Sequence, residues 1–248
     1  SSAASDVYKR QTIKTIKKGI IMDNKKIYII NGSPRKNQNT AKMCSSFVLG
    51  VESTGIEAEI VNLYDLNFKG CQSCFACKLR GGKNLGRCAY PDDLKEVLNK
   101  VSYSNGIAFA SPIYFGDVTG VMKAFMERLL FPFVTYDENY TPIPPKKLET
   151  AVIYTMNVNE AMFIKSYIGA NNSGPLGFFE NWISHIYKKP VRVCAFNTYQ
   201  FSDYSKYVAD VWDEKEKAKQ RDEVFPIDLK NAYEAGKNMG YMIINNGK

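Results

Sequence analysis

A short polar stretch, NGSPRKNQNT at residues 31–40, constrains this chain most strongly. An apolar run at residues 26–30 precedes it and predicts a buried strand, whereas residues 41–51 predict a helix. The stretch is therefore a strand-to-helix loop. Its glycine, its hydroxyl and amide side chains, its arginine and the free N–H groups of the helix start concentrate hydrogen-bond donors at one point. The sequence predicts that this loop binds a phosphate group.

Two common nucleotide-binding motifs do not describe this loop. It lacks the lysine of GxxxxGK[ST], which argues against hydrolysis of nucleoside triphosphates. It also lacks GxGxxG, whose glycines let a pyrophosphate approach the backbone, so it is a poor primary dinucleotide loop. On this stretch alone, an ordinary capped turn between a strand and a helix remains an open alternative.

A second motif follows the apolar run at residues 106–110, which predicts the central strand. It reads SPIYFGDVTGVMKAFMER, residues 111–128, and places a proline and aromatic residues where the strand ends and an amphipathic helix begins. Ligands of open parallel α/β sheets bind beyond the carboxyl ends of strands, where the strand order reverses. The two motifs are therefore predicted to face each other at one edge of the sheet.

The remaining pattern alternates strands with helices. Further strands are predicted at residues 57–63, 148–155 and 191–196, and further helices at 92–103, 176–188 and 228–245. This alternation predicts an α/β fold with a doubly wound, flavodoxin-like, five-stranded parallel sheet in the order 2-1-3-4-5 between two helical layers. Residues 22–248 are predicted to form this single domain. Residues 1–21 are predicted to be a non-native or disordered extension, with Met22 as the natural start.

Four of the six cysteines lie in a long loop at residues 67–89, where CQSCFAC supplies three of them. They are Cys71, Cys74, Cys77 and Cys88. Three cysteines at this spacing with a fourth from elsewhere are typical of a [4Fe-4S] cluster. A thiol-rich loop without metal, a zinc site and a redox disulfide remain open alternatives. Cys44 and Cys194 are predicted to be buried core residues.

Together the two loop motifs resemble those of the flavodoxin-like NADPH-dependent FMN reductase and iron-sulfur flavoprotein family. The matching strings are GSPRxxxNT and SPxYFxxxxxxxKxFxxR. The resemblance implies that the FMN phosphate is bound by Ser33, Arg35, Asn39 and Thr40. It implies flavin contacts from Pro112, Ile113, Tyr114, Phe115 and Gly116, and from a third loop at Thr155, Met156 and Asn157. That third loop lacks the glycine that is common in the family.

The resemblance implies an FMN-dependent oxidoreductase. Electrons would pass from NAD(P)H or a ferredoxin-like donor through FMN to a small-molecule acceptor or to a [4Fe-4S] cluster on the four cysteines. The flavin N5 performs this chemistry, so no catalytic side chain is predicted. The alternatives are a metal-free quinone, nitro or azo reductase, an FMN-binding electron carrier that docks on protein partners, and a zinc-stabilised binding module. Members of the family are commonly dimers or tetramers, which implies a homo-oligomer.

Charge and cysteine usage limit the partners and the location. Residues 1–21 carry +4 of the net charge of +8, and the rest is typical of an ordinary solvated surface. Nucleic acid and membrane partners are therefore not predicted. Clustered thiols without a secretory signal indicate the reducing cytoplasm. Lys123 and Arg128 are expected on the helix surface, and the charged run at residues 213–223 is expected to form a solvated helix.

Overall fold

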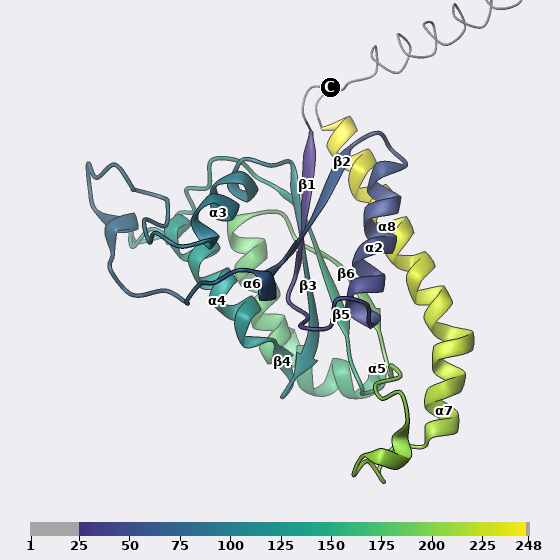
Figure 1. The fold of residues 1–248 in the computed structure, drawn as a ribbon. Coiled ribbons are helices and arrows are strands. Elements are labelled where there is room, and N and C mark those ends of the chain that lie inside the picture. The colour runs from purple at the N-terminus through teal and green to yellow at the C-terminus, as the bar shows by residue number, and fades with distance from the viewer. Residues whose placement is uncertain (1–24, 247–248) are drawn as a thin grey trace, which may run out of the picture.

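The computed structural model describes residues 25–246, and its centre is one parallel sheet (Figure 1). The sheet order is β2-β1-β3-β5-β6. These five parallel strands are β1 (Lys26–Asn31), β2 (Glu57–Asn62), β3 (Gly106–Tyr114), β5 (Glu149–Thr155) and β6 (Val191–Ala195). They confirm the predicted strands and their predicted order. The predicted extension at residues 1–21 lies outside the described residues.

A sixth strand, β4 (Asp117–Val118), pairs antiparallel with the end of β3 and was not predicted. Because of this pairing, β3 continues through Tyr114, whereas the sequence pattern ends the strand at residue 110. Residues 111–114 are thus strand rather than loop. Two residues are too few to produce a pattern from which β4 could be predicted.

Seven α-helices surround the sheet within the described part of the chain. They are α2 (Asn39–Glu52), α3 (Leu94–Ser102), α4 (Gly120–Leu130), α5 (Glu160–Met162), α6 (Pro175–Ile186), α7 (Glu214–Lys219) and α8 (Phe225–Asn245). None of the helices between residues 25 and 246 is both long and apolar enough to cross a membrane. Between α5 and α6 the chain forms a π-helix, Phe163–Ile168, and a 3-10 turn, Ala170–Asn172.

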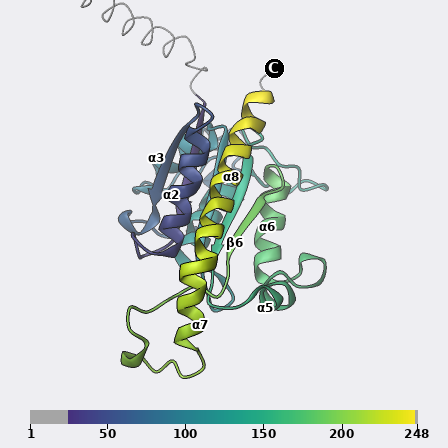
Figure 2. The same cartoon turned by 90° about the vertical axis from the view of Figure 1, so that its right-hand side faces the viewer.

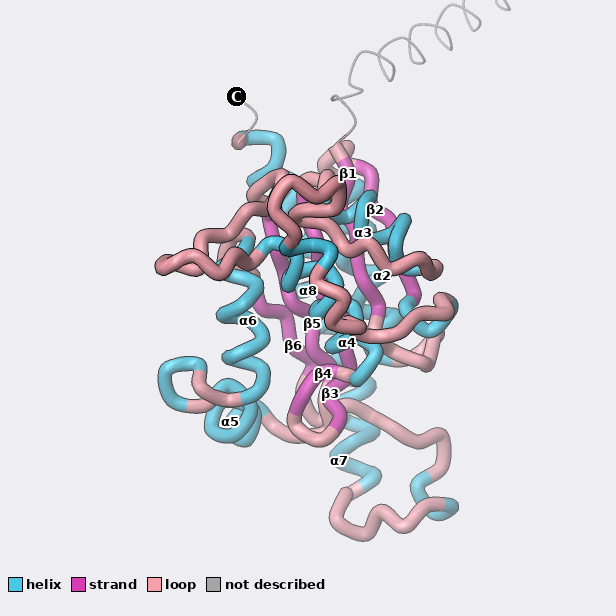
Figure 3. The backbone as a smooth tube through the Cα atoms, turned by 90° about the vertical axis from the view of Figure 1, so that its left-hand side faces the viewer, coloured by secondary structure: helices cyan, strands magenta, loops and turns pink. Residues whose placement is uncertain are grey.

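The two faces of the sheet are covered by different helices. Helices α3, α4 and α6 pack on one face, and α2 and α8 lie side by side on the other (Figure 2). Because β3 is covered on both faces, its side chains alternate between the two helical layers. Ile107 and Phe109 face the first layer, and Ala108 and Ala110 face the second. One group of irregular segments, pink in Figure 3, lies on the side of the first layer, and another lies next to α7.

Helices α2 and α8 approach each other so closely that their backbones touch. A Cβ atom on Gly50 would lie 1.9 Å from the Tyr233 carbonyl oxygen, and one on Gly236 would lie 2.1 Å from the Phe47 carbonyl oxygen. Neither carbonyl can move without disturbing its helix. This contact fixes the position of α2, and with it the loop at residues 31–40 that leads into α2.

We predict that Gly236→Ala lowers the free energy of unfolding by about 1–3 kcal/mol, because the new methyl group overlaps the α2 backbone. Helix propensity alone predicts the opposite sign, since alanine is about 1 kcal/mol better than glycine inside a helix. Urea unfolding measures the difference. Asn238→Ala, on the exposed side of the same helix, is the control, and stabilisation in Gly236→Ala would contradict the contact.

Asp228, also on α8, is a buried carboxyl group. Its Oδ2 atom has no hydrogen-bond partner in residues 25–246, and burial raises the pKa of Asp228 to about 6. The unfolded chain releases this proton near the ordinary value of 3.8, so the folded state binds more protons between about pH 4 and 6. The contribution of Asp228 to the free energy of unfolding is therefore favourable at low pH and is lost as the pH rises to about 6.

We predict that Asp228→Asn raises the free energy of unfolding at pH 7.5 by about 1–2 kcal/mol and changes it little near pH 3.5. Urea unfolding at both pH values, with Glu234→Gln as an exposed control on the same helix, measures the effect. An equal change at the two pH values would show that ionisation of Asp228 is not its cause.

Candidate functional site

The loop that follows β1, residues 32–40, is called the phosphate loop here. Its first residue, Gly32, donates its N–H to the Ala110 carbonyl at 2.8 Å, and its own carbonyl accepts from Thr119 Oγ1 at 2.9 Å. A Cβ atom on Gly32 would lie 3.0 Å from Thr119 Oγ1 and 3.2 Å from Met122. The loop after β1 therefore starts directly against the N-terminus of α4, the helix that follows β3 and β4.

The backbone of the phosphate loop is arranged around Ser33. The Ser33 N–H donates to Asn31 Oδ1 at 3.0 Å, and the Arg35 N–H donates to Ser33 Oγ at 3.2 Å. The N–H groups of residues 36, 37 and 39–41 have no acceptor within the described structure, and no side chain caps the start of α2. Several free donors at a helix N-terminus are the arrangement that binds an anion.

Among the predicted flavin-contact residues of the second motif, Phe115 and Gly116 form the turn of the β3–β4 hairpin, whereas Pro112, Ile113 and Tyr114 lie in β3. Phe115 and Gly116 have φ angles of 52° and 80°, which makes the tip a type I′ turn. A phenylalanine with positive φ is an uncommon, strained residue. Its side chain is fully exposed, Tyr114 is 41% exposed, and Pro112 is buried in the strand. Ile113, half-buried, packs at the edge of the first core.

The third predicted loop reaches the site through only one of its residues. Thr155 Oγ1 lies 2.7 Å from Thr40 Oγ1 at the start of α2, and this contact is buried. The Met156 side chain is 3% exposed and belongs to the core. Asn157 instead donates to Gln200 Oε1 at 3.0 Å.

Residues 197–212, called the covering segment here, contact the phosphate loop. Arg35 Nη1 donates to the Gln200 carbonyl at 3.0 Å, and Asn39 Nδ2 donates to the Tyr199 carbonyl at 2.9 Å. Figures 1 and 2 show this part of the chain, between β6 and α7, projecting beyond the end of the sheet. Sequence reasoning missed it, because its only signal is an aromatic and polar composition. Two predicted phosphate ligands thus already donate to the covering segment.

Lys217 anchors the covering segment from α7. Its Nζ donates to the Asn157 carbonyl at 3.0 Å and also to the side-chain oxygens of Asn157 and Asn197, and it lies 4.4 Å from the Trp212 ring centre. Burial lowers its pKa to about 8. The expectation of a fully solvated helix at residues 213–223 is therefore wrong at this residue, which is 2% exposed.

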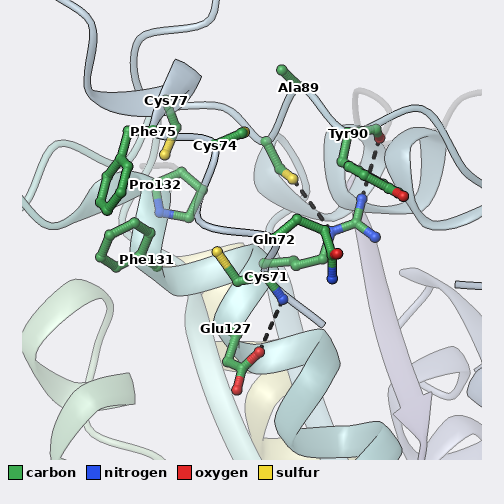
Figure 4. A pocket seen from close by; sticks show the side chains of 12 residues that line it. Cys71, Gln72, Cys74, Phe75, Cys77, Ala89, Tyr90, Glu127, Phe131 and Pro132 are labelled. Atoms are coloured by element: carbon green, nitrogen blue, oxygen red, sulfur yellow. Dashed lines mark hydrogen bonds between the residues drawn. The ribbon is translucent and has the colours of Figure 1, made fainter. Parts of the chain in front are cut away.

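The four predicted metal-ligating cysteines line a single pocket, called the cysteine pocket here (Figure 4). Ser73 and Phe75 have φ angles of 50° and 53°, so the chain turns sharply between the first three cysteines. Lys78 holds the loop in place, because its Nζ donates to the carbonyls of Phe131 and Val134 and lies 4.2 Å from the Phe131 ring centre. All four thiols are free.

Arg128 joins both ends of the cysteine loop to α4. Its Nε donates to Cys88 Sγ at 3.3 Å, and its guanidinium also reaches the carbonyls of Lys69 and Tyr90. Asp92 compensates its charge through an ion pair of 2.5 Å, and the Arg128 side chain is 1% exposed. The expectation that Arg128 lies on the helix surface is wrong. The helix pattern alone could not show its burial, because the partners of Arg128 lie outside the helix. Lys123 does pair at the surface, with Asp117 at 2.9 Å.

The donor set of the cysteine pocket is four thiols, which both a [4Fe-4S] cluster and a zinc ion can take as ligands. Within residues 25–246, no three His, Cys, Asp or Glu side chains lie close enough to hold one metal ion. Four thiols nevertheless open onto one pocket, and the Glu127 carboxylate there accepts from the Cys71 N–H at 3.0 Å. Burial raises the pKa of Cys77, and the nearby Lys78 opposes this shift. Four cysteine ligands are the set that a [4Fe-4S] cluster takes.

We predict that Arg128→Met lowers the free energy of unfolding by about 3–5 kcal/mol, because it leaves Asp92 buried without its partner. Lys123→Met on the same helix is the matched control, and we expect it to cost at most about 1 kcal/mol since its ion pair is at the surface. Urea unfolding of both variants measures the difference. Equal effects would contradict the structural role of Arg128.

Residues 25–143 match a family model described as NADPH-dependent FMN reductase. An iron-sulfur flavoprotein of Archaeoglobus fulgidus is 39% identical over 103 residues, which are 42% of this chain and 48% of that protein. An iron-sulfur flavoprotein of Methanocaldococcus jannaschii is 35% identical over 103 residues, which are 42% of this chain and 51% of that protein. The chain thus spans about half the length of the curated relatives it matches.

Two solved structures share the fold over most of their length. A NAD(P)H:quinone oxidoreductase from Methanothermobacter marburgensis superposes with a TM-score of 0.65 at 16% identity, covering 87% of this chain and 99% of that one. An FMN-dependent NADH-azoreductase from Bacillus anthracis, in complex with FMN, superposes with a TM-score of 0.56 at 14% identity, covering 88% of this chain and 99% of that one. Residues 25–143, which carry the phosphate loop, the cysteine pocket and β3, are the part of the chain that matches the NADPH-dependent FMN reductase family.

Proposed function

We propose that this protein is an FMN-dependent oxidoreductase that takes electrons from NAD(P)H or a ferredoxin-like donor. It passes them to a small-molecule acceptor or to a [4Fe-4S] cluster held by Cys71, Cys74, Cys77 and Cys88. FMN, when bound, supplies the chemistry by accepting and releasing electrons at its ring. The cysteine usage supports a cytoplasmic location, and the family supports a homodimer or homotetramer.

The observation that carries this proposal is the contact between Gly32 and Thr119. It places the free donors of the phosphate loop beside the β3–β4 hairpin, so that one ligand can meet both. We assign the phosphate to Ser33, Arg35, Asn39 and Thr40, where the α2 N-terminus favours negative charge. The strained and exposed Phe115 lies in the turn that we assign to the flavin ring, as is common for strained residues at ligand sites.

Helix α4 connects the two parts of the proposed electron path. Thr119 at its start contacts the phosphate loop, and Arg128 near its end contacts Cys88. Nine residues of helix separate the two contacts by roughly 13 Å along the helix axis. The Arg128 guanidinium would place a positive charge and a hydrogen bond at the Cys88 sulfur, both of which stabilise the more negative, reduced form of a cluster.

The first experiment records the visible spectrum of anaerobically purified protein and measures iron and zinc on the same sample. We expect a flavin spectrum with a broad absorbance and about four irons per chain. A flavin spectrum without iron would support a metal-free quinone, nitro or azo reductase instead. A colourless protein with one zinc would contradict both and support a binding module.

The second experiment tests the phosphate ligands. We predict that Arg35→Met weakens FMN binding by about tenfold or more, because a charge-assisted hydrogen bond contributes about 1.5–3 kcal/mol. Riboflavin, which has no phosphate, should bind the variant and the parent protein equally. Quenching of flavin fluorescence measures both affinities, with Lys230→Met on the exposed surface of α8 as the control. An equal loss for FMN and riboflavin would contradict the assignment of Arg35 to the phosphate.

A further inference from the structure

A larger cavity lies on the other side of Cys88 from the cysteine pocket. It holds about 1000 Å³ and is bounded by residues 83–88, by α3 and by the proline-rich stretch at 132–145. Cys88 and Arg128 line both spaces. Its volume is at the upper end of the range for small-molecule sites. Nothing in the proposed function uses this cavity, which we call the α3 cavity.

The outer wall of the α3 cavity is built by the long interval between Cys77 and Cys88. This interval is folded into successive turns rather than an open loop. The Gly86 N–H donates to the Cys77 carbonyl at 3.0 Å, Leu85 N–H donates to Gly82 at 3.1 Å, and Arg87 N–H donates to Asn84 at 2.9 Å. Gly86 has a φ of 72°, and a Cβ there would lie 3.6 Å from Ile143, so this side chain packs next to Gly86. The wall therefore has a defined shape.

Charge in the α3 cavity is unbalanced. Two carboxylates line it, and each is already paired, Asp92 with Arg128 at 2.5 Å and Glu96 with Lys100 at 2.8 Å. Lys83, Arg87 and Lys95 also line it, and none of these three forms an ion pair with a carboxylate in residues 25–246. The cavity thus presents uncompensated positive charge, which attracts anions.

Apolar and neutral polar side chains supply the rest of the lining. Among the apolar ones, Leu98 and Leu129 belong to the buried core, Phe133 is 3% exposed, and Ile143 is 39% exposed. A ligand that fits must therefore combine an apolar body with acidic groups at its edge.

We propose that the α3 cavity is a second binding site, for a small anionic molecule with an apolar body. Its acidic groups meet Lys83, Arg87 and Lys95, and its apolar body packs between Leu98, Phe133 and Ile143. The site does not rest on the proposed function, since it is separate from the phosphate loop and requires neither FMN nor a cluster. Its shared wall at Cys88 places a bound molecule directly beside the cysteine pocket.

The test uses anthraquinone-2,6-disulfonate, a planar molecule with two acidic groups, titrated calorimetrically into the full chain at low salt with excess FMN present. We expect one binding site, weakened at least about tenfold by the double substitution Lys83→Glu and Arg87→Glu, because two attractions become repulsions. Lys230→Glu, an exposed reversal on the opposite face of the sheet, should leave binding unchanged. A second variant, Asn99→Trp, fills the cavity without changing charge and should also weaken binding.

Three results would overturn the proposal. The first is that the parent protein does not bind the probe, and the second is that the double variant binds it with the same affinity as the parent. The third is binding that occurs only when FMN is left out, because the probe would then occupy the flavin site. A protein that binds the probe but ignores FMN would instead contradict the proposed function and leave this site standing. Circular dichroism melting of the variants confirms that lost binding is not lost folding.

Discussion

The buried hydrogen bond from Thr119 Oγ1 to the Gly32 carbonyl is the contact on which the rest of the site depends. Together with the bond from Gly32 N–H to Ala110, it joins the carboxyl ends of β1 and β3, where a parallel sheet places its ligands. A Cβ atom there would press on Thr119 and Met122, so a side chain would require these two residues to move by a few tenths of an ångström. The contact orients the phosphate loop and the first turn of α4 at once. A shift in either would change the distance between the proposed phosphate and ring subsites.

Two further packing contacts support this arrangement from opposite faces of the sheet. On one face, the backbone contact of α2 with α8 fixes the helix whose N-terminus faces the proposed phosphate. On the other, Arg128 ties α4 to both ends of the cysteine loop, and Asp92 compensates its buried charge. Helix α4 therefore contacts both the phosphate loop and the cysteine pocket. Two chemically different sites share one rigid element, which is how a scaffold keeps their separation constant.

Much of the fold could be predicted from the sequence, because each parallel strand is an apolar run and each crossover contains a helix. The loop at residues 32–40 and the four cysteines could also be singled out as candidate sites, since their motifs are local in the sequence. The burial of Arg128 could not be found, because its partners Cys88 and Asp92 lie 40 and 36 residues away. The covering segment was missed for the same reason, as Arg35 and Gln200 are separated by 165 residues. Strand β4 has two residues, too few for any periodicity.

Hydrogen exchange of the backbone amides with and without FMN tests whether the two turns bind one ligand, because it reports on both turns in one experiment. We predict that FMN slows exchange together in the peptides that cover residues 33–41 and 112–120, while peptides from the middle of α8 do not change. Protection of the first peptide alone would mean that the phosphate binds but the hairpin does not meet the ring. No protection in either peptide would contradict the proposal that these two turns form one flavin site.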